Sequence, residues 1–474
     1  HGPFAAVGRA PAARLGLAPA RIAPVLRALV AAGRLYEGEL IPGGSGAELC
    51  DPDVLRRVRR DTLARLRNEV APVDAAVLAR FLPRWHGVGS ARGGMARLRE
   101  AIDQLEGLAL PFSELERAIL PARVPDFQPR MLDELGAAGE VVWVGQGALG
   151  SDDGRVVVYR REHVASLFDA PSPVAEAPKL PGELHRAILA HLGARGASFA
   201  AQLPEAAARP DEVVRALWDL VWLGLVTNDT FAPLRTIGRT SRGPRGRFSL
   251  PAGGRWSTLA SVVGAPPAET VRAHTRALML LERYGVVSRE AAAAESLPGG
   301  FSSVSGVLRA MEESGKIRRG HFVDGLTGAQ FAHAAAVDRL RAARDVGGDA
   351  VGPAVVVLSA IDPANPYGAL LPWPSDGPRR VAGAKVVLAL GEPIFFVERG
   401  GKKLRLLARP DAIDEALVEP ALAALRRIAA ARRHRQLRIE EVDGVPALHS
   451  PHAALLERGG FRVEPGALVL SADD

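Results

Sequence analysis

Hydrophobic and polar positions recur in the same order several times along the chain. A stretch with apolar residues at helical spacing is followed by a turn, a second helical stretch, a glycine and an extended segment with alternating apolar residues. The best-defined extended segment, residues 140–160, predicts a hairpin with its turn at Asp153-Gly154. Helices followed by an amphipathic hairpin are typical of a winged helix. The pattern therefore predicts a series of winged-helix units.

Local signals refine two of these units. Ser113 and Glu116 have the spacing of a capping box, which predicts that a helix begins there. Residues 210–223 have the pattern of a recognition helix. Within it, Trp218 and Trp222 lie four positions apart and share one face, which favours a place in the core over stacking on bases.

A strongly amphipathic helix is predicted over residues 51–70. Its apolar positions, among them Leu55, Val58 and Leu63, keep near-helical spacing. Its other face carries a row of arginines: Arg56, Arg57, Arg59, Arg60, Arg65 and Arg67. Such a helix is either a solvated bridge between domains or an element that follows a phosphate backbone.

After residue 335 the pattern changes to short, apolar segments bounded by turns, with one helix predicted over residues 411–433. Several short strands with glycine turns favour a small barrel. The predicted fold class is a multidomain α+β protein, with tandem winged-helix domains followed by a small β-barrel-like module. The predicted order is a winged helix truncated at its N-terminus (1–46), a helical connector (47–93), a winged helix (94–168), a linker (169–182), a winged helix (183–234), an arginine-rich strap (235–256), a winged helix (257–335) and the β-barrel module with one inserted helix (336–474).

The composition narrows the class of protein. A chain of 474 residues with 47% hydrophobic residues has enough apolar material for several folded domains, and no apolar run is long enough to span a bilayer. Cys50 is the one cysteine, which excludes an internal disulfide framework and favours the reducing cytoplasm. The chain begins with His1 and has no secretory signal pattern, so we expect a fragment of a longer cytoplasmic, nucleoid-associated protein.

The net charge of +7 is modest for this length, so local clusters of cations carry more weight than the total. Residues 235–256 hold several arginines without an acid, and Trp256 closes the segment. This segment is either a disordered surface linker or a strap that orders on the DNA backbone. A second basic cluster lies in the predicted exit hairpin of the last winged helix. The candidate DNA-binding residues are Arg235, Arg239, Arg242, Arg245, Arg247, Arg255, Trp256, Lys316, Arg318, Arg319 and His321.

Few motifs of catalysis are found in the sequence. It contains no phosphate-binding loop motif, so no cofactor is expected in this chain, and no zinc-binding spacing is found; His449 and His452 are poorly placed for a metal. The polar loop at 362–374 supplies the candidate catalytic residues Asp362, Asn365 and Tyr367. Asp362 is either part of a rigid turn or a carboxylate that stabilises base excision.

Phrases spread over nearly the whole sequence resemble the C-terminal region of the bacterial large helicase-related (Lhr) proteins. The C-terminal half is also similar to winged-helix DNA glycosylases of the YcaQ type. The motif of those enzymes is a pair of Gln, or of Gln and Asp, one residue apart, and residues 359–362 offer only the acid of Asp362. The phrases that carry the resemblance are "HGPF" (1–4), "LPFSELERAILPARV" (110–124), "LDELGAAGEVVWVGQGAL" (132–149), "GRW" (254–256), "LLERYGVVSREA" (280–291), "AMEESGKIRRGHFVDGL" (310–326) and "DPANPYGALLPWP" (362–374).

This resemblance implies a 3′-to-5′ translocase on single-stranded DNA whose ATP- and Mg-dependent motor domains precede residue 1. It also implies DNA repair, a string of winged helices before a β-barrel, and self-association. The leading hypothesis is a DNA-binding and assembly region without ATPase activity, with DNA, upstream helicase domains of the same chain and further copies of itself as partners. The alternatives are a DNA glycosylase that excises uracil or alkylated bases, and a protein-interaction scaffold of winged helices. No membrane partner is expected.

Overall fold

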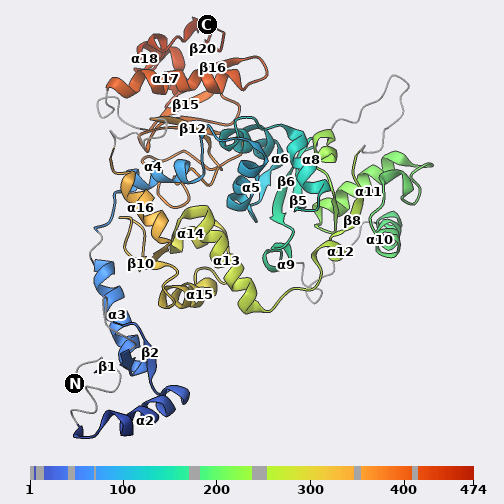
Figure 1. Cartoon of the computed structure of the whole chain (residues 1–474). Coiled ribbons are helices and arrows are strands. Elements are labelled where there is room, and N and C mark those ends of the chain that lie inside the picture. The colour runs from blue at the N-terminus through green and yellow to red at the C-terminus, as the bar shows by residue number, and fades with distance from the viewer. Residues whose placement is uncertain are drawn as a thin grey trace.

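One strand order recurs in the computed structural model, which describes residues 5–6, 15–40, 48–68, 71–169, 182–237, 253–345, 354–407 and 415–473 (Figure 1). In each of four units within these residues, the last strand of the sheet lies between the first two strands. All of these strand pairs are antiparallel. This is the sheet of a winged helix: a short first strand, then a hairpin that follows the recognition helix. The predicted tandem winged-helix architecture is confirmed.

The second unit is the most regular. Its sheet has the order β4-β6-β5, and the predicted hairpin is formed by β5 and β6. Its elements are α5 (Gly94–Leu105), β4 (Leu110–Pro111), α6 (Phe112–Glu114), the π-helical turn η1 (Leu115–Ile119), α7 (Leu120–Arg123), α8 (Pro129–Ala137), β5 (Val141–Leu149), β6 (Asp153–Arg160) and α9 (Val164–Leu167).

Two local predictions for this unit were wrong. The turn of the hairpin lies at residues 150–152, so Asp153 and Gly154 belong to β6. No capping box forms, because the Ser113 hydroxyl donates to Asp153 at 2.6 Å and the Glu116 carboxylate accepts from Arg235 at 2.6 Å. Tertiary partners thus replace the local partners that the spacing suggested.

The fourth unit has the same plan, with sheet order β9-β11-β10. Its recognition helix is α15, and its hairpin is the predicted basic exit. The elements are α13 (Glu269–Tyr284), β9 (Val286–Val287), α14 (Arg289–Ala294), α15 (Ser302–Glu313), β10 (Arg318–Gly320) and β11 (Gln330–Ala332), followed by α16 (Ala334–Ala342).

The third unit extends past its predicted end at residue 234. Strand β8 pairs with β7, and Ser198 bridges Trp256 on the other side of β8. The arginine-rich segment therefore connects the second and third strands of this unit, in the place of a wing, and residues 253–258 belong to the sheet. The elements are α10 (Glu183–Arg195), η2 (Ala200–Gln202), α11 (Pro210–Trp222), β7 (Val226–Asn228), η3 (Ala232–Thr236), β8 (Trp256–Thr258) and α12 (Leu259–Val263).

The first unit stands apart from the others at the lower left of Figure 1, at the end of helix α3. Its sheet has the order β1-β3-β2. The predicted connector 47–93 divides into two helices with different surroundings: α3 leaves the first unit, whereas α4 enters the core of the fourth unit. The elements are β1 (Ala5–Ala6), α2 (Pro19–Ala31), β2 (Tyr36–Gly38), β3 (Glu48–Cys50), α3 (Pro52–Asn68) and α4 (Ala75–Trp85).

The C-terminal module consists of two sheets, and no closed barrel is present among the described residues. One sheet has the order β12-β13-β14-β15-β17-β18 and the other β16-β20-β19, with α17 packed against both. The elements are β12 (Val355–Ser359), β13 (Lys385–Ala389), β14 (Glu392–Val397), β15 (Lys403–Leu406), α17 (Glu415–Ala430), β16 (Gln436–Ile439), β17 (Glu441–Val442), β18 (Val445–Pro446), η5 (Ala447–His449), α18 (Ala453–Arg458), β19 (Arg462–Glu464) and β20 (Ala467–Ser471).

The units share hydrophobic cores. Residues of α4, of the fourth unit and of strands β12 and β13 form one core, in which Leu78, Leu280 and Val386 are fully buried. The second and third units share another core, which includes Trp143 and Trp256. Trp218 and Trp222 pack against that core with their rings stacked 5.4 Å apart, as predicted. Shared cores make the body formed by these units a single packed structure.

Candidate nucleic-acid interface

The predicted catalytic acid lies inside the protein. Asp362 is 1% exposed, and its carboxylate accepts hydrogen bonds from both terminal nitrogens of Arg123, at 2.9 and 2.6 Å. Burial alone would raise the pKa of Asp362, but the charge of Arg123 and its hydrogen bonds hold that pKa below its usual value. Asp362 is therefore an ionised partner in a buried ion pair.

The other two candidate catalytic residues are also internal. The Asn365 amide donates to the carbonyls of Ala360 and Tyr367, at 3.1 and 3.3 Å, and closes the loop on itself. The Tyr367 hydroxyl donates to the carbonyl of Gly391 at 2.8 Å. Asp362, Asn365 and Tyr367 lie together in a buried, hydrogen-bonded turn, which agrees with the rigid turn that was one of the two interpretations.

This loop joins the second unit to the C-terminal module. The guanidinium of Arg380 donates to four carbonyls of the loop, at 2.7 to 3.2 Å. Beside it, Glu114 of α6 accepts from Ser359 and Lys385, at 2.7 and 2.8 Å. Neither Arg123 nor Arg380 was singled out from the sequence, because each has its partners at a distance along the chain that no spacing rule reveals.

A buried histidine lies in the same charged environment. His86 follows α4 and is fully buried, and neither ring nitrogen has a hydrogen-bond partner among the described residues. Burial lowers the pKa of His86 well below its ordinary value, and the positive charge of Arg123 adds to this effect. His86 is therefore neutral at neutral pH.

The basic hairpin of the fourth unit is, in contrast, on the surface. Lys316 and Arg318 are exposed, and neither has an ion-pair partner among the described residues. Arg319 is half-buried with its guanidinium 5.8 Å from the centre of the Phe331 ring, and His321 contacts Asp324 at 3.2 Å. The hairpin thus offers two cations without a counter-charge directly after the recognition helix.

Helix α15 presents a suitable face beside that hairpin. Its exposed positions include Ser302, Gly306, Arg309 and Glu313, which follow one another at helical spacing and form a stripe along the helix. Ser302 and Gly306 are small enough to let the helix lie close to a nucleic-acid groove, and Arg309 has the length to reach base edges there, whereas Glu313 places one acid at the end of the stripe.

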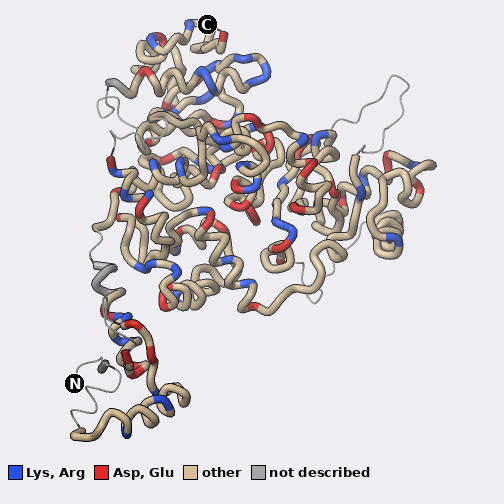
Figure 2. Tube along the Cα trace, viewed as in Figure 1, with Lys and Arg blue, Asp and Glu red and all other residues tan. Residues whose placement is uncertain are grey.

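Helix α3 contacts the hairpin and carries further exposed cations. α3 contacts β10, and the chain that follows α3 is held there because Val73 exchanges backbone hydrogen bonds with the loop after β10, to Phe322 and from Asp324 at 2.8 and 2.9 Å. Arg57, Arg59 and Arg60 of α3 are exposed and have no ion-pair partner among the described residues. Figure 2 marks basic positions on both elements.

The arginine-rich strap is only partly described. Arg239, Arg242, Arg245 and Arg247 lie outside the described residues. Arg235 is held by Glu116 and Asp133, at 2.6 and 2.7 Å, and Arg255 by Asp229 at 2.9 Å.

Trp256, expected to contact DNA, is fully buried and meets the Trp218 ring edge-on at 5.9 Å. Its burial removes both ring faces from any base, so the prediction of a DNA-contacting tryptophan was wrong. The ends of the strap, residues 235–237 and 253–256, are parts of the third unit.

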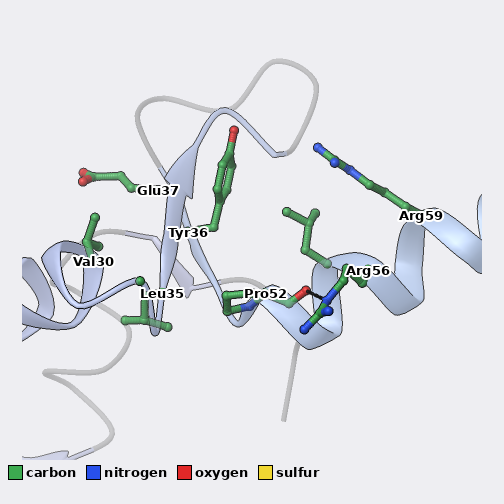
Figure 3. Close-up of a pocket in the computed structure, with 9 residues that line it drawn as sticks. Val30, Leu35, Tyr36, Glu37, Pro52, Arg56 and Arg59 are labelled. Atoms are coloured by element: carbon green, nitrogen blue, oxygen red, sulfur yellow. Dashed lines mark hydrogen bonds between the residues drawn. The ribbon is translucent and has the colours of Figure 1, made fainter. Parts of the chain in front are cut away.

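A cleft of about 780 Å³ opens in the first unit, between strand β2 and the start of α3 (Figure 3). In Figure 3, Tyr36 of β2 and Arg59 of α3 extend to the same side of the cleft, whereas Arg56 points to the other side. Leu55 of α3 also lines the cleft. The other residues that line the cleft are Val30, Gly33, Leu35, Glu37 and Pro52. Sequence analysis noted the arginines of α3 but not Tyr36, because a lone tyrosine in a short strand carries no motif.

Metal and membrane features are not found in the part of the chain that the structure describes. No group of three or more metal-ligating side chains gathers among these residues. Of the helices in the described ranges, none has both the length and the apolar character needed to cross a bilayer.

Comparison with known proteins agrees with the winged-helix architecture. Residues 73–161 and residues 266–351 each match a winged-helix domain model of the large helicase-related protein. The first match begins at α4 and ends after β6, and the second begins just before α13 and extends beyond α16.

Two curated relatives align with most of the chain. Over 470 aligned residues it is 40% identical to an Lhr helicase and probable uracil glycosylase of Mycolicibacterium smegmatis, covering 92% of this chain and 30% of that protein. Over 468 residues it is 37% identical to an Lhr helicase and uracil glycosylase of Escherichia coli, covering 88% of this chain and 30% of that protein. The chain thus spans about 30% of the length of each relative.

A solved structure, the DNA glycosylase AlkZ of Streptomyces sahachiroi, aligns with 76% of this chain and 96% of its own at 15% identity and a TM-score of 0.43. The strand order and the family matches agree with each other. Residues 73–161 and 266–351 of this chain are winged-helix domains of the large helicase-related family.

Proposed function

We propose that this chain is the C-terminal, DNA-holding region of a large helicase-related DNA repair protein, and that the fourth winged helix makes the main DNA contact. The observation that carries the proposal is the basic hairpin after α15, where Lys316 and Arg318 are exposed and have no acidic partner among the described residues. Phosphate groups are the natural partners of such cations, and a winged helix presents them beside its recognition helix.

The arrangement supports positioning of DNA rather than chemistry on it. α15 offers two small residues, Ser302 and Gly306, for the approach to a groove, the hairpin offers cations for one strand, and α3 carries further exposed arginines. Contacts of this kind fix the register of a duplex without reading its sequence. ATP- and Mg-driven translocation belongs, in this proposal, to helicase domains elsewhere in the full-length protein, since the sequence contains no phosphate-binding loop motif.

The test is the salt dependence of DNA binding by the 474-residue chain. In the double variant Lys316→Ala/Arg318→Ala, we expect weaker duplex binding at every sequence and a slope of log affinity against log salt reduced by about 1 to 2. The matched control is Arg186→Ala/Arg195→Ala, which removes two exposed arginines from α10, the first helix of the third unit. Equal slopes for the two double variants would contradict the proposal.

A second candidate function is excision of uracil or alkylated bases. Both curated relatives are named as uracil glycosylases, one of them as a probable one, and they are 37% to 40% identical to this chain. The test is incubation of the chain with uracil- and alkyl-base-containing oligonucleotides without ATP, followed by alkaline cleavage. A cleaved product establishes excision. Binding without a cleaved product supports the DNA-holding function only.

Assembly forms the remaining part of the proposal. Self-association of this region, in a cytoplasmic, nucleoid-associated protein, is tested by light scattering with and without DNA. A monomer that binds DNA with full affinity would remove assembly from the proposed function. A self-associated form that does not bind DNA would favour a protein-interaction scaffold.

A further inference from the structure

The cleft in the first unit contains an aromatic ring that is held in place but left uncovered. Tyr36 is 46% exposed, and within the described residues it has no aromatic partner. Its ring lies over Gly38: a Cβ atom at that position would be 2.9 Å from the ring carbon Cε1. Because Gly38 has no side chain, this edge of the ring has room beside the backbone, and the ring lines the cleft (Figure 3).

The opposite wall of the cleft is apolar at its base and cationic at its edge. Leu55 and Arg59 lie one helical turn apart on α3 and therefore share a face. Arg56 is paired with Asp53, whereas Arg59 has no ion-pair partner among the described residues. In Figure 3 the side chain of Arg59 extends from α3 toward the side of the cleft where Tyr36 lies.

The acid of the cleft does not neutralise this edge. Glu37 follows Tyr36 in strand β2, and successive side chains of a strand point to opposite faces. Figure 3 shows Glu37 on the far side of β2 from Tyr36. The side of the cleft that contains Tyr36 and Arg59 therefore combines a ring, an apolar floor and an unpaired guanidinium.

We propose that this cleft binds single-stranded nucleic acid, with one base stacked on Tyr36 and an adjacent phosphate paired with Arg59. Exposed aromatic rings beside a cationic groove are the features by which proteins hold single strands without sequence preference. Bases of a duplex have both faces covered by their neighbours, so only an unpaired base can stack on the ring. The volume of about 780 Å³ lies within the range of small-ligand pockets.

This inference rests on the proposed function of holding DNA, and it adds a second site with a different substrate class. The fourth unit contacts a duplex through its hairpin, whereas the first unit, which stands apart on α3, holds an unpaired strand. Together the two sites fit a junction between duplex and single-stranded DNA.

The test compares binding of oligo-dT and of a duplex of equal length by the 474-residue chain. In Tyr36→Ala we expect roughly 5- to 100-fold weaker oligo-dT binding and unchanged duplex binding. Tyr36→Phe keeps the stacking surface and should bind within about twofold of the parent chain. The matched control is Phe199→Ala, which removes another exposed ring, 53% accessible, from the third unit.

A second readout locates the contact directly. Oligonucleotides that contain 5-bromodeoxyuridine, irradiated in complex with the chain, should crosslink to Tyr36, as peptide mass spectrometry can show. Arg59→Ala should reduce the salt slope of oligo-dT binding by about 0.7.

The possible failures are distinguishable. Oligo-dT binding that is unchanged in Tyr36→Ala overturns the single-strand site, and it leaves the proposed function intact if Lys316→Ala/Arg318→Ala still weakens duplex binding. Crosslinks confined to other units also overturn it. If neither variant affects any DNA, the site and the proposed function both fail.

Discussion

Arg123, the last residue of α7, donates two hydrogen bonds to the carboxylate of Asp362, a residue 239 positions later in the chain. Both side chains are at most 1% exposed. The pair lies where the second winged helix meets the C-terminal module, next to the Glu114–Lys385 ion pair, 2.8 Å long. It therefore fixes the relative position of two units that the sequence presents as separate.

The first prediction concerns this pair. Arg123→Ala leaves an uncompensated buried carboxylate, so we expect the free energy of unfolding to fall by about 3 to 5 kcal/mol. Urea denaturation measures the loss. Arg56→Ala breaks the exposed pair with Asp53 and should cost less than about 1 kcal/mol. Arg123→Met combined with Asp362→Leu should recover much of the lost stability.

Asp362→Asn separates a structural role from a catalytic one. If the chain excises uracil and this variant folds with near-parent stability but excises none, Asp362 is a catalytic residue and the structural role fails. We expect the reverse: a loss of stability, with any excision retained in proportion to the folded fraction.

The pH dependence of stability should report His86. Its pKa is lowered in the folded state, so below its ordinary pKa of about 6.5 the unfolded chain binds a proton that the folded chain does not. The contribution of His86 to the free energy of unfolding is therefore complete above that pH. It falls by about 1.4 kcal/mol per pH unit as the pH decreases toward the pKa of the folded state.

Urea titrations at pH 7.0, 6.0 and 5.0 should show this decrease for the parent chain. His86→Leu should flatten the curve over the same interval, since leucine does not titrate. His434→Leu is the control, because His434 is an exposed histidine. An equal pH slope for the parent chain and His86→Leu would refute the assignment.

A third prediction tests the extent of the third unit. Trp256→Ala should destabilise the core shared by the second and third units by about 3 to 5 kcal/mol, because a fully buried indole is removed. Trp256→Phe should cost less, since the indole Nε1 has no hydrogen-bond partner among the described residues. Thermal unfolding followed by far-UV circular dichroism measures both. A free strap ending at Trp256 would instead leave stability unchanged.

A fourth prediction concerns the contact between the second hairpin and α11. A Cβ added at Gly154 would lie 2.0 Å from the Trp222 ring, so Gly154→Ala must displace that ring. We expect a loss of about 1 to 3 kcal/mol from overpacking. Gly150→Ala, in the turn of the same hairpin, is the control without a steric clash, because its Cβ would meet only Asp152, at 3.9 Å. The backbone of this control variant is strained, since φ at Gly150 is +73°. Equal losses in the two variants would remove the packing explanation.

Periodicity determined much of the architecture. Apolar spacing predicted α11 within about a residue of its ends, and the alternation in residues 140–160 predicted the β5–β6 hairpin. Trp218 and Trp222 were placed in the core for the same reason. These features depend on residues close together in the chain, where helical or strand spacing alone decides which face is buried.

Tertiary structure decided what those residues do. Asp362 was read as a possible base because no rule of spacing reveals Arg123, and Trp256 as a DNA contact because its partner strand β7 lies across the arginine-rich segment. In place of the predicted barrel the structure has two sheets. β15 pairs with β17, and because α17 and β16 lie between these two strands in the sequence, local spacing does not reveal the pairing. Sequence thus determined the repeated winged helices and their basic hairpin. The packing of distant segments decided which charged and aromatic side chains are internal and which are left for a nucleic acid.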